Sequence, residues 1–139
     1  MAIKKLLDII LTSLNDGKAI DIDLFDVKKI TSMSDYILIA SGNSSRQVNA
    51  LADRLIQTVK ENKFETLGVE GKAEGEWVLV DLGDIIVHIM HPNSREYYQL
   101  EKLIFHRKLQ SKKLAVLWKP LQIMLEDRLT LLFLKYHIH

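Results

Sequence analysis

The segment that follows the apolar run 36–40 combines a glycine turn with a helix start, a pattern that can bind phosphate. It reads Ser41-Gly42-Asn43-Ser44-Ser45 and precedes a stretch with helical periodicity. Backbone N–H groups at a helix N-terminus attract anions. The spacing matches neither the Walker A motif nor Gly-x-Gly-x-x-Gly, because Gly42 is the only glycine in the turn. A helix cap after a buried strand, with Ser44 or Ser45 as the capping residue, is therefore the better interpretation.

Two carboxylates, Asp21 and Asp23, have the spacing with which nucleotidyltransferases hold the metal ions that clamp a triphosphate. In those enzymes the pair lies on the strand after the Gly-Ser turn, whereas here the pair precedes the turn. After the turn, Asp53 lies in an expected helix, and Leu55 stands where a second carboxylate is needed. A nucleotidyltransferase-like enzyme that uses Asp21, Asp23 and the Gly42 turn is therefore kept only as an alternative.

The remaining candidate side chains form no recognisable catalytic or metal site. His88 and His91 are three residues apart on an expected strand, so they point to opposite faces, and no third ligand is evident. Asp81 and Asp84 flank an expected turn, where carboxylates more often stabilise the turn than act as a general-acid pair. The absence of cysteine excludes disulfides and thiolate ligands and is typical of a reducing compartment. We expect no catalysis, no cofactor and no metal.

The elements that position these residues follow from the periodicity of the apolar side chains. A spacing of three to four predicts helices, whereas alternation or a short continuous run predicts strands. Helices are expected at 3–14, 44–59 and 95–103, with Asn93 or Ser94 capping the third, and strands at 20–24, 36–40, around 67–69, 77–81 and 84–90. This order predicts the α/β class in the form of an α+β mixed sheet, with about five strands and helices packed on the sheet.

The last two strands are expected to form an antiparallel hairpin that turns at Leu82-Gly83, where glycine permits a positive φ. With a two-residue loop, Val80 opposes Ile85 and Trp77 opposes His88. One face of the hairpin is aliphatic and suits the core: Val78, Val80, Ile85, Val87 and Ile89. The other, named the Trp77 face, carries Trp77, Leu79, Ile86, His88 and Met90. Such a face is enriched at protein interfaces, but a covering helix would explain it equally well, and spacing alone favours neither.

Length and composition predict one globular domain without a membrane span. A chain of 139 residues with 47% apolar and 27% charged residues is typical of a soluble protein. The N-terminus is basic and then apolar like a signal peptide, but Asp8 interrupts the apolar part and no small-residue cleavage site follows. A first helix is the better interpretation.

Charge divides the chain into an acidic body and a basic end. Residues 1–103 carry 12 Lys and Arg against 16 Asp and Glu, whereas residues 104–139 carry 7 against 2. Because nucleic-acid affinity depends largely on cationic contacts, the acidic body suits a basic protein partner better than a phosphate backbone. We expect a domain at 1–103 and a basic, apolar extension at 104–139, in which 121–134 has helical periodicity.

Several motifs within residues 3–103 together resemble the ribosomal silencing factor family, also known as Iojap-related proteins. They are Ser34-Asp35-Tyr36, Ala40-Ser41-Gly42 with Ser45-Arg46, Gly71 with Glu74-Gly75-Glu76-Trp77, Asp81-Leu82-Gly83-Asp84, Val87-His88, and Arg95-Glu96-Tyr97-Tyr98 with Leu100-Glu101. From Ile104 onward the sequence departs from the family pattern, and a ribosomal RNA-binding accessory factor that uses this basic tail is a second alternative.

The resemblance implies a binding protein related in fold to nucleotidyltransferases but without their active site. It implies a cytoplasmic translation repressor that binds large-subunit ribosomal protein fourteen and sterically blocks association of the large subunit with the small subunit. Translation would thereby be damped when nutrients are scarce. It also implies a homodimer when free, no membrane and no sequence-specific nucleic-acid contact.

For the partner-binding residues, the hairpin itself supplies the prediction. We expect Trp77 to be the anchor, because tryptophan is enriched among residues whose truncation weakens binding most. The predicted set is Trp77, Leu79, Asp81, Asp84, Ile86, His88, Met90 and Tyr98, with Glu74 and Glu76 as further rim charges that steer association. Tyr97 and Tyr98 either lie beside this face or in a dimer contact, or one lies in the core while its neighbour is half exposed.

Overall fold

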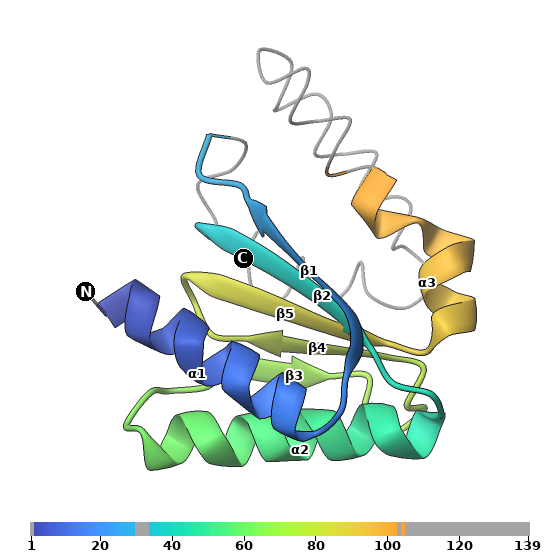
Figure 1. Cartoon of the computed structure of the whole chain (residues 1–139), viewed down its shortest axis with the longest axis horizontal. Coiled ribbons are helices and arrows are strands. Elements are labelled where there is room, and N and C mark those ends of the chain that lie inside the picture. Colours follow the sequence, from blue (N-terminus) through green and yellow to red (C-terminus); the bar gives the residue numbers. More distant parts are fainter. Residues whose placement is uncertain (1, 30–33, 103, 105–139) are drawn as a thin grey trace.

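The computed structural model describes residues 2–29, 34–102 and 104, and these form a mixed sheet with helices packed on it (Figure 1). The predicted order of helix, two strands, helix, three strands and helix is confirmed. The elements are α1 (Ala2–Asp16), β1 (Ile20–Asp26), β2 (Tyr36–Ser41), α2 (Ser45–Glu61), β3 (Gly68–Glu70), β4 (Trp77–Asp81), β5 (Ile85–Met90) and α3 (Pro92–Tyr98). None of the helices in the described ranges is long and apolar enough to span a membrane.

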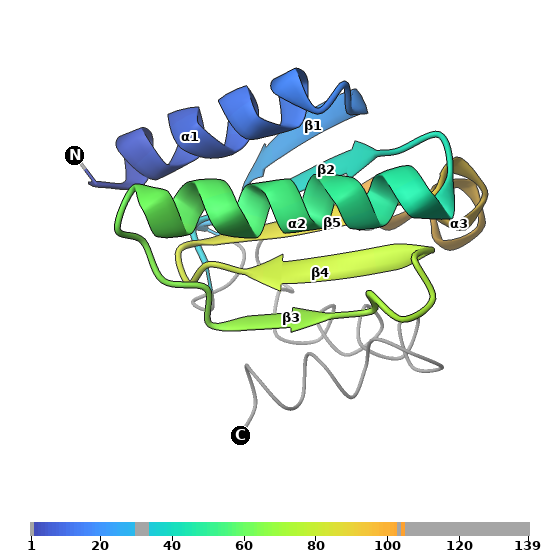
Figure 2. The ribbon, with the colours of Figure 1, turned by 90° about the horizontal axis from the view of Figure 1, so that it is seen from below.

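The five strands lie in the order β1-β2-β5-β4-β3, which confirms the mixed sheet. Only β2 and β5 are parallel, and the other neighbours are antiparallel. Because β2 and β5 run in the same direction, their C-terminal ends meet at one edge, where Ser41 pairs with Met90. The chain leaves this edge into α2 after β2 and into α3 after β5, so α3 and the start of α2 lie at the same end of the sheet (Figures 1 and 2).

The two faces of the sheet carry separate hydrophobic clusters. Figure 2 shows α1 and α2 side by side across one face. There, Leu6, Ile10 and Leu14 of α1 pack in one cluster with aliphatic residues of α2 and the strands. The opposite face holds a second cluster, which contains Val27, Ile37, Ile39, Trp77, Leu79, Ile86, Met90, Leu100 and Ile104. The aliphatic face predicted for the hairpin therefore lies in the first cluster, and the Trp77 face lies in the second.

The predicted register of the hairpin was wrong by two residues. Trp77 pairs with Met90 and Leu79 with His88. The last pair before the turn is Asp81 with Ile86, so residues 82–85 form the connection, which is longer than the predicted two-residue loop. Within it, the Leu82 N–H donates to the carbonyl oxygen of Ile85 over 3.0 Å. A shift of two residues preserves the side-chain alternation of a strand, so the two predicted faces keep their composition.

Helix α2 begins as predicted, whereas α3 begins three residues earlier than expected. Ser44 has an extended backbone, and its Oγ accepts a hydrogen bond from the Gln47 N–H over 3.1 Å. The cap of α3 is His91, not Asn93 or Ser94, and Pro92 occupies the first turn, where a proline loses no helical hydrogen bond. The helix ends at Tyr98, because Gln99 adopts the left-handed conformation with a φ of 49°.

Strand β1 contains a bulge that interrupts the predicted alternation. Ile20 pairs with Ser41, but Asp23 pairs with Ile39, so β1 carries one more residue than β2 across this interval. Asp21, at the bulge, has a φ of 51°. A bulge changes the direction of the side chains on its strand, and beyond this one Asp23 lies on the same side of the sheet as Ile39 and Trp77.

Candidate functional site

Most of the predicted partner-binding residues lie in the interior. Trp77 is 1% exposed and His88 is fully buried, whereas Asp84 is exposed and Tyr98 is half-buried. The buried members of the predicted set are Trp77, Leu79, Asp81, Ile86, His88 and Met90. The Trp77 face was interpreted either as an exposed interface or as a face covered by the protein itself. In the structure it is covered. The partner-binding role of these residues stays a prediction.

The centre of the Trp77 face is a polar contact between two aromatic side chains. The indole N–H of Trp77 donates to Nδ1 of His88 over 2.9 Å, and their ring centroids are 5.8 Å apart. A neutral imidazole that accepts at Nδ1 carries its proton on Nε2. The pair lets a tryptophan and a histidine share the interior without leaving the indole N–H unsatisfied.

The cover over Trp77 comes from α3 and the residues that follow it. The Tyr98 ring lies 4.8 Å from Trp77 between centroids, and Leu100 and Ile104 belong to the same buried cluster. Tyr97, in contrast, is 80% exposed and meets Tyr98 edge to face at 4.9 Å. Neither tyrosine lies in the core: Tyr98 is half-buried beside the Trp77 face, and Tyr97 is more exposed than the half-exposed neighbour that was expected.

The two carboxylates of the hairpin turn have different surroundings. Asp81 is buried, and its Oδ1 accepts from the Gly83 N–H over 2.9 Å, which is the turn-stabilising role expected for it. The Asp84 carbonyl oxygen accepts from the N–H groups of Asp35 and Tyr36, so its backbone ties the turn to the start of β2. The Asp84 side chain remains exposed.

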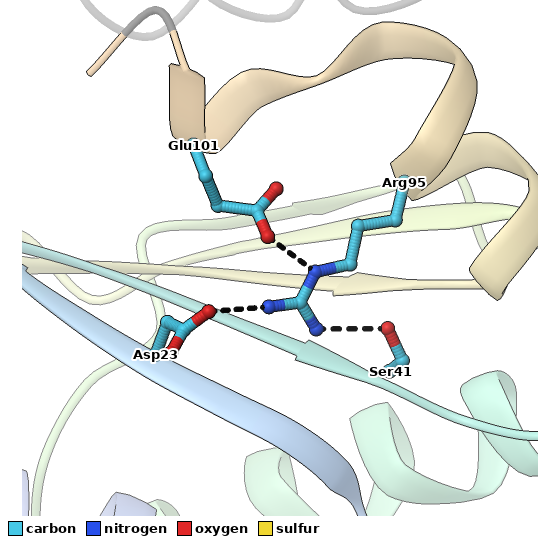
Figure 3. Close-up of polar contacts among 4 residues, drawn as sticks. All are labelled: Asp23, Ser41, Arg95 and Glu101. Carbon is cyan, nitrogen blue, oxygen red and sulfur yellow. Dashed lines mark hydrogen bonds and ion pairs between the residues drawn. The ribbon is translucent and has the colours of Figure 1, made fainter. Parts of the chain in front are cut away.

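A second polar site, which the sequence did not reveal, is built around Arg95 of α3 (Figure 3). Its Nε donates to Glu101 over 2.8 Å, one terminal nitrogen donates to the Ser41 Oγ over 2.9 Å, and the other donates to Asp23 over 2.8 Å. The guanidinium thus joins β1, β2 and the segment after α3 in one contact. A hollow of about 390 Å³ adjoins it, lined in part by Ser41, Arg95 and Glu101.

The Arg95 site bears directly on the enzyme alternative. Asp23, one of the two carboxylates that would hold metal ions, forms an ion pair with Arg95 instead. Among residues 2–29, 34–102 and 104, no group of three His, Cys, Asp or Glu side chains could hold a metal ion. His91 accepts from the Asn93 N–H at the start of α3, so it is a cap residue and not part of the strand.

Side chains of the Gly42 turn and of the first turn of α2 accept hydrogen bonds from the backbone N–H groups there. Besides the Ser44 cap, the Asn43 N–H donates to Oε1 of Gln47 over 2.6 Å. The Val48 N–H donates to the carbonyl oxygen of Ser44. A Cβ on Gly42 would lie 2.9 Å from the Val48 nitrogen, so glycine is needed for close packing of the turn on the helix. These N–H groups serve the helix cap, as expected from the spacing.

The loop between β3 and β4 packs against the start of α2, which explains its glycines. A Cβ on Gly75 would lie 2.9 Å from the carbonyl oxygen of Ser45, and one on Gly71 would overlap the carbonyl oxygen of Trp77. Both glycines have positive φ angles. An ion pair between Lys72 and Asp53 adds a contact between the loop and α2. The loop thereby fixes the position at which β4 begins with Trp77.

One lysine beside β2 has a shifted pKa. Lys28 Nζ donates to the Tyr36 hydroxyl over 3.2 Å and lies 3.6 Å from Asp26 Oδ2. The hydrogen bond to Tyr36, and then the charge of Asp26, raise the pKa of Lys28 above its ordinary value of 10.5. Lys28 also lies over the Tyr36 ring, 5.0 Å from its centroid.

Comparisons with known proteins agree with the fold and with the motifs. The family described as ribosomal silencing factor during starvation matches residues 1–123. This match runs past residue 103, and the domain boundary expected there stays a prediction. The ribosomal silencing factor of Haemophilus influenzae is 49% identical over 98 residues, which are 70% of this chain and 96% of that protein. The Bacillus subtilis factor is 43% identical over 100 residues, 72% of this chain and 85% of that protein.

A crystal structure extends the likeness to three dimensions. The solved protein, from Chromobacterium violaceum, superposes with a TM-score of 0.72 at 42% identity, and the match covers 74% of this chain and 86% of that one. The sequence motifs, the mixed sheet and the family match over most of the chain lead to one conclusion: this chain belongs to the ribosomal silencing factor family.

Proposed function

We propose that this protein is a cytoplasmic translation regulator that binds the large ribosomal subunit and prevents its association with the small subunit. The observation that carries the proposal is membership of the ribosomal silencing factor family across the whole described fold. The partner that we propose is large-subunit ribosomal protein fourteen. The mechanism is steric and needs no chemistry, because a bound domain of this size on the joining surface is sufficient to keep the two subunits apart.

The binding surface that we propose includes the Trp77 face and the residues at its border. An interface of ordinary size buries about 800 Å² on each partner, so it would extend beyond a single side chain. The border has acidic groups at both ends of β4, with Asp84 at the hairpin turn and Glu74 and Glu76 before Trp77, and all three are exposed. Charges at a border act mainly on the association rate and its salt dependence.

Among the aromatic residues that the structure describes, exposed Tyr97 is the one best placed to contact a partner without prior rearrangement. It lies against Tyr98, which in turn packs on Trp77, so it is continuous with the proposed surface. An exposed aromatic residue supplies a large contact area with little loss of side-chain entropy. We further propose that the free protein is a homodimer.

The experiment that tests this function is sedimentation of separated ribosomal subunits with the protein, followed by a subunit-joining assay. The wild type should sediment with the large subunit and reduce joining. Tyr97→Ala should weaken both effects, and Asp84→Asn should slow association, most clearly at low salt. Asp8→Asn, an exposed carboxylate on α1 at the other face of the sheet, is the matched control and should behave as wild type.

Two results would contradict the proposal. The first is a folded wild-type protein that sediments with neither subunit. The second is binding to the large subunit that leaves the joining of the subunits unchanged. Equal effects of Asp84→Asn and Asp8→Asn would locate the binding surface elsewhere.

A further inference from the structure

Strand β1 forms an open edge of the sheet. Within the part of the chain that the structure describes, β2 is the only strand beside it (Figure 1). The opposite edge is β3, which has 3 residues, whereas β1 has 7. An edge strand presents backbone N–H and C=O groups with which another strand can pair. Of the two edges, β1 is therefore the one long enough to receive a further strand.

The hydrogen bonds of β2 show which residues of β1 bond to it. The Tyr36 N–H donates to the carbonyl oxygen of Asp84 over 3.1 Å, at the start of β5, so Tyr36 directs its backbone groups away from β1. Successive residues of a strand direct these groups to alternate sides. Ile37 therefore directs its groups towards β1, where its partner in the register is Phe25.

The same alternation identifies the groups of β1 that face the open edge. The Val27 N–H donates to the carbonyl oxygen of Asp35 over 2.9 Å, so Val27, like Phe25, directs its backbone towards β2. The residues between and before these two point the other way. Leu24 and Asp26 thus direct their N–H and C=O groups out of the sheet.

The open part of the edge is short and regular. The bulge, a feature that protects edge strands, lies between Ile20 and Asp23, and residues 23–26 pair with β2 without interruption. Beyond them, the Lys28 N–H donates to Oδ1 of Asp26 over 3.0 Å. Two outward residues, each with one N–H and one C=O, therefore offer four backbone groups to an added strand.

Apolar side chains lie on both faces of the open part. Leu24 pairs with Leu38, a member of the first cluster, so its side chain is on the side of α1 and α2. It is 41% exposed, and only two other large apolar side chains are exposed among the described residues. Phe25 is half-buried against the second cluster, on the opposite side. An added strand would meet one apolar side chain on each face.

The charge of β1 selects the partner. The strand carries three carboxylates and no cation. The side chains of Asp23 and Asp26, which flank the apolar pair, are 54% and 48% exposed even though they contact Arg95 and Lys28. Like charges on neighbouring strands destabilise their pairing, and opposite charges favour it. A second copy of β1 would bring three more carboxylates to this edge, whereas a basic segment would complement those already there.

From these observations we propose that β1 accepts an extended segment of a protein partner as an added strand, and that this segment reads basic, apolar, apolar, basic. Its apolar residues lie opposite Leu24 and Phe25, and its basic residues lie opposite Asp23 and Asp26. The pattern is symmetric, so it fits in either strand direction. In strand addition the main-chain hydrogen bonds supply affinity and the side chains supply specificity.

This contact goes beyond the proposed function, because it lies apart from the Trp77 face. Strands β2 and β5 separate β1 from β4, which carries Trp77. The two surfaces can therefore be tested separately, and the tests of β1 need no ribosome.

The open edge itself is tested by amide hydrogen exchange of the free full-length protein, followed by NMR. The Leu24 and Asp26 amides should exchange roughly tenfold or more faster than those of Phe25 and Val27, because only the latter donate to β2. Equal protection of all four amides would overturn the open edge. Protection of Leu24 and Asp26 that rises with protein concentration would show that a second copy occupies the edge, and would also overturn the proposal.

Binding is tested with the peptide acetyl-Thr-Lys-Val-Val-Lys-Thr-amide. It should cause saturable NMR shifts that are largest at the Leu24 and Asp26 amides, and at saturation it should slow the exchange of both. One control peptide has glutamate in place of both lysines, which reverses the charge. The other is N-methylated at both valines, which removes hydrogen-bond donors from the middle of the peptide. Each control should bind about tenfold more weakly or less.

Variants of β1 test the same contact from the side of the protein. Leu24→Pro removes one outward N–H and leaves the bonds to β2 in place, a position at which an edge strand tolerates proline. It should weaken peptide binding about tenfold. Asp26→Asn should weaken binding less, and chiefly at low salt. Asp8→Asn, an exposed carboxylate on α1, is the matched control and should bind as wild type.

Thermal unfolding establishes that each variant is folded, and the N-methylated peptide tests the backbone contact in the wild type if Leu24→Pro is not. The absence of saturable shifts at millimolar lysine peptide, or equal affinities for the lysine and glutamate peptides, would overturn the proposal. Shifts centred on the Trp77 face would overturn the location. Peptide binding at β1 by a protein that sediments with neither ribosomal subunit would support this inference and refute the proposed function.

Discussion

The indole N–H of Trp77 and Nδ1 of His88 are joined by a buried 2.9 Å hydrogen bond between two strands. Trp77 begins β4, His88 lies near the end of β5, and Leu79 is the residue that pairs with His88. The bond is therefore diagonal across the hairpin and links positions that the strand register does not pair. Its burial makes each partner costly to remove alone.

The first prediction concerns this pair. Because His88→Leu leaves the indole N–H without its acceptor, we expect it to lower the free energy of unfolding by about 1–3 kcal/mol. Trp77→Phe should also destabilise, since it removes the donor together with side-chain volume. Urea unfolding of both single variants and of the double variant gives the coupling, which we expect to be about 1 kcal/mol or more. If the destabilisation of the double variant equals the sum of the two single values, the hydrogen bond contributes no coupling energy.

The faces of the hairpin were predictable from sequence although its register was not. Alternation along a strand assigns side chains to faces, and a shift of two residues leaves that assignment intact. The predicted two-residue turn ignored the Asp81 carboxylate, which accepts from the Gly83 N–H and stabilises a wider connection. An aspartate two residues before a glycine was the signal that could have indicated it.

The Arg95 site could not be found by spacing, because its members are far apart in the sequence. Asp23 and Arg95 are 72 residues apart and meet only through the parallel pairing of β2 with β5 and the position of α3. The same limit applies to the burial of Trp77. Composition marks a face as apolar and aromatic, but whether a later segment covers it depends on where that segment returns.

The second prediction compares two glycines with similar backbone angles. Gly75 and Gly83 have φ angles of 67° and 86°, so alanine is strained at both positions. Only at Gly75 would the new Cβ lie 2.9 Å from a carbonyl oxygen, that of Ser45, whereas at Gly83 the nearest atom is 3.5 Å away, at the end of the Leu67 side chain.

We expect Gly83→Ala to cost about 1–2 kcal/mol from the backbone alone, and Gly75→Ala to cost more because the loop must also move away from α2. Thermal unfolding of the two variants measures the difference, which isolates the steric contribution. If the two variants lose the same stability, the loop can move away from α2 at no measurable cost and does not fix the start of β4.

The third prediction follows from the raised pKa of Lys28. A hydrogen bond to Tyr36 is its first cause and the charge of Asp26 its second. A raised pKa means that the folded state binds the proton more tightly than the unfolded chain. The stabilisation is therefore complete below about pH 10.5, the ordinary lysine value, and is lost as the pH rises through the higher pKa of the folded state.

Titration of the Lys28 side chain by NMR checks this. Tyr36→Phe should bring the pKa of Lys28 down towards its ordinary value, and Asp26→Asn should lower it by a smaller amount, in the order of the two causes. If Asp26→Asn has the larger effect, the charge dominates and the hydrogen bond to the tyrosine is secondary.

The fourth prediction addresses the turn after β2. The Ser44 hydroxyl accepts from the Gln47 N–H, so Ser44→Ala should lower the free energy of unfolding by about 1 kcal/mol. Ser45→Ala, at the first residue of α2, is the matched control and should change stability by less than about 0.5 kcal/mol. Chemical denaturation of both variants measures the difference.

The same variants distinguish a helix cap from a phosphate cradle. Because Ser44 and the Gln47 side chain already occupy N–H groups of the turn, inorganic phosphate or a nucleotide with Mg²⁺ should leave the melting temperature of the wild type unchanged. Saturable stabilisation by a nucleotide, reduced in Ser44→Ala and in Asp21→Asn, would contradict the cap interpretation and restore the enzyme alternative. Ligand binding to the native state raises its stability by mass action, so even a weak site would be detected at millimolar concentration.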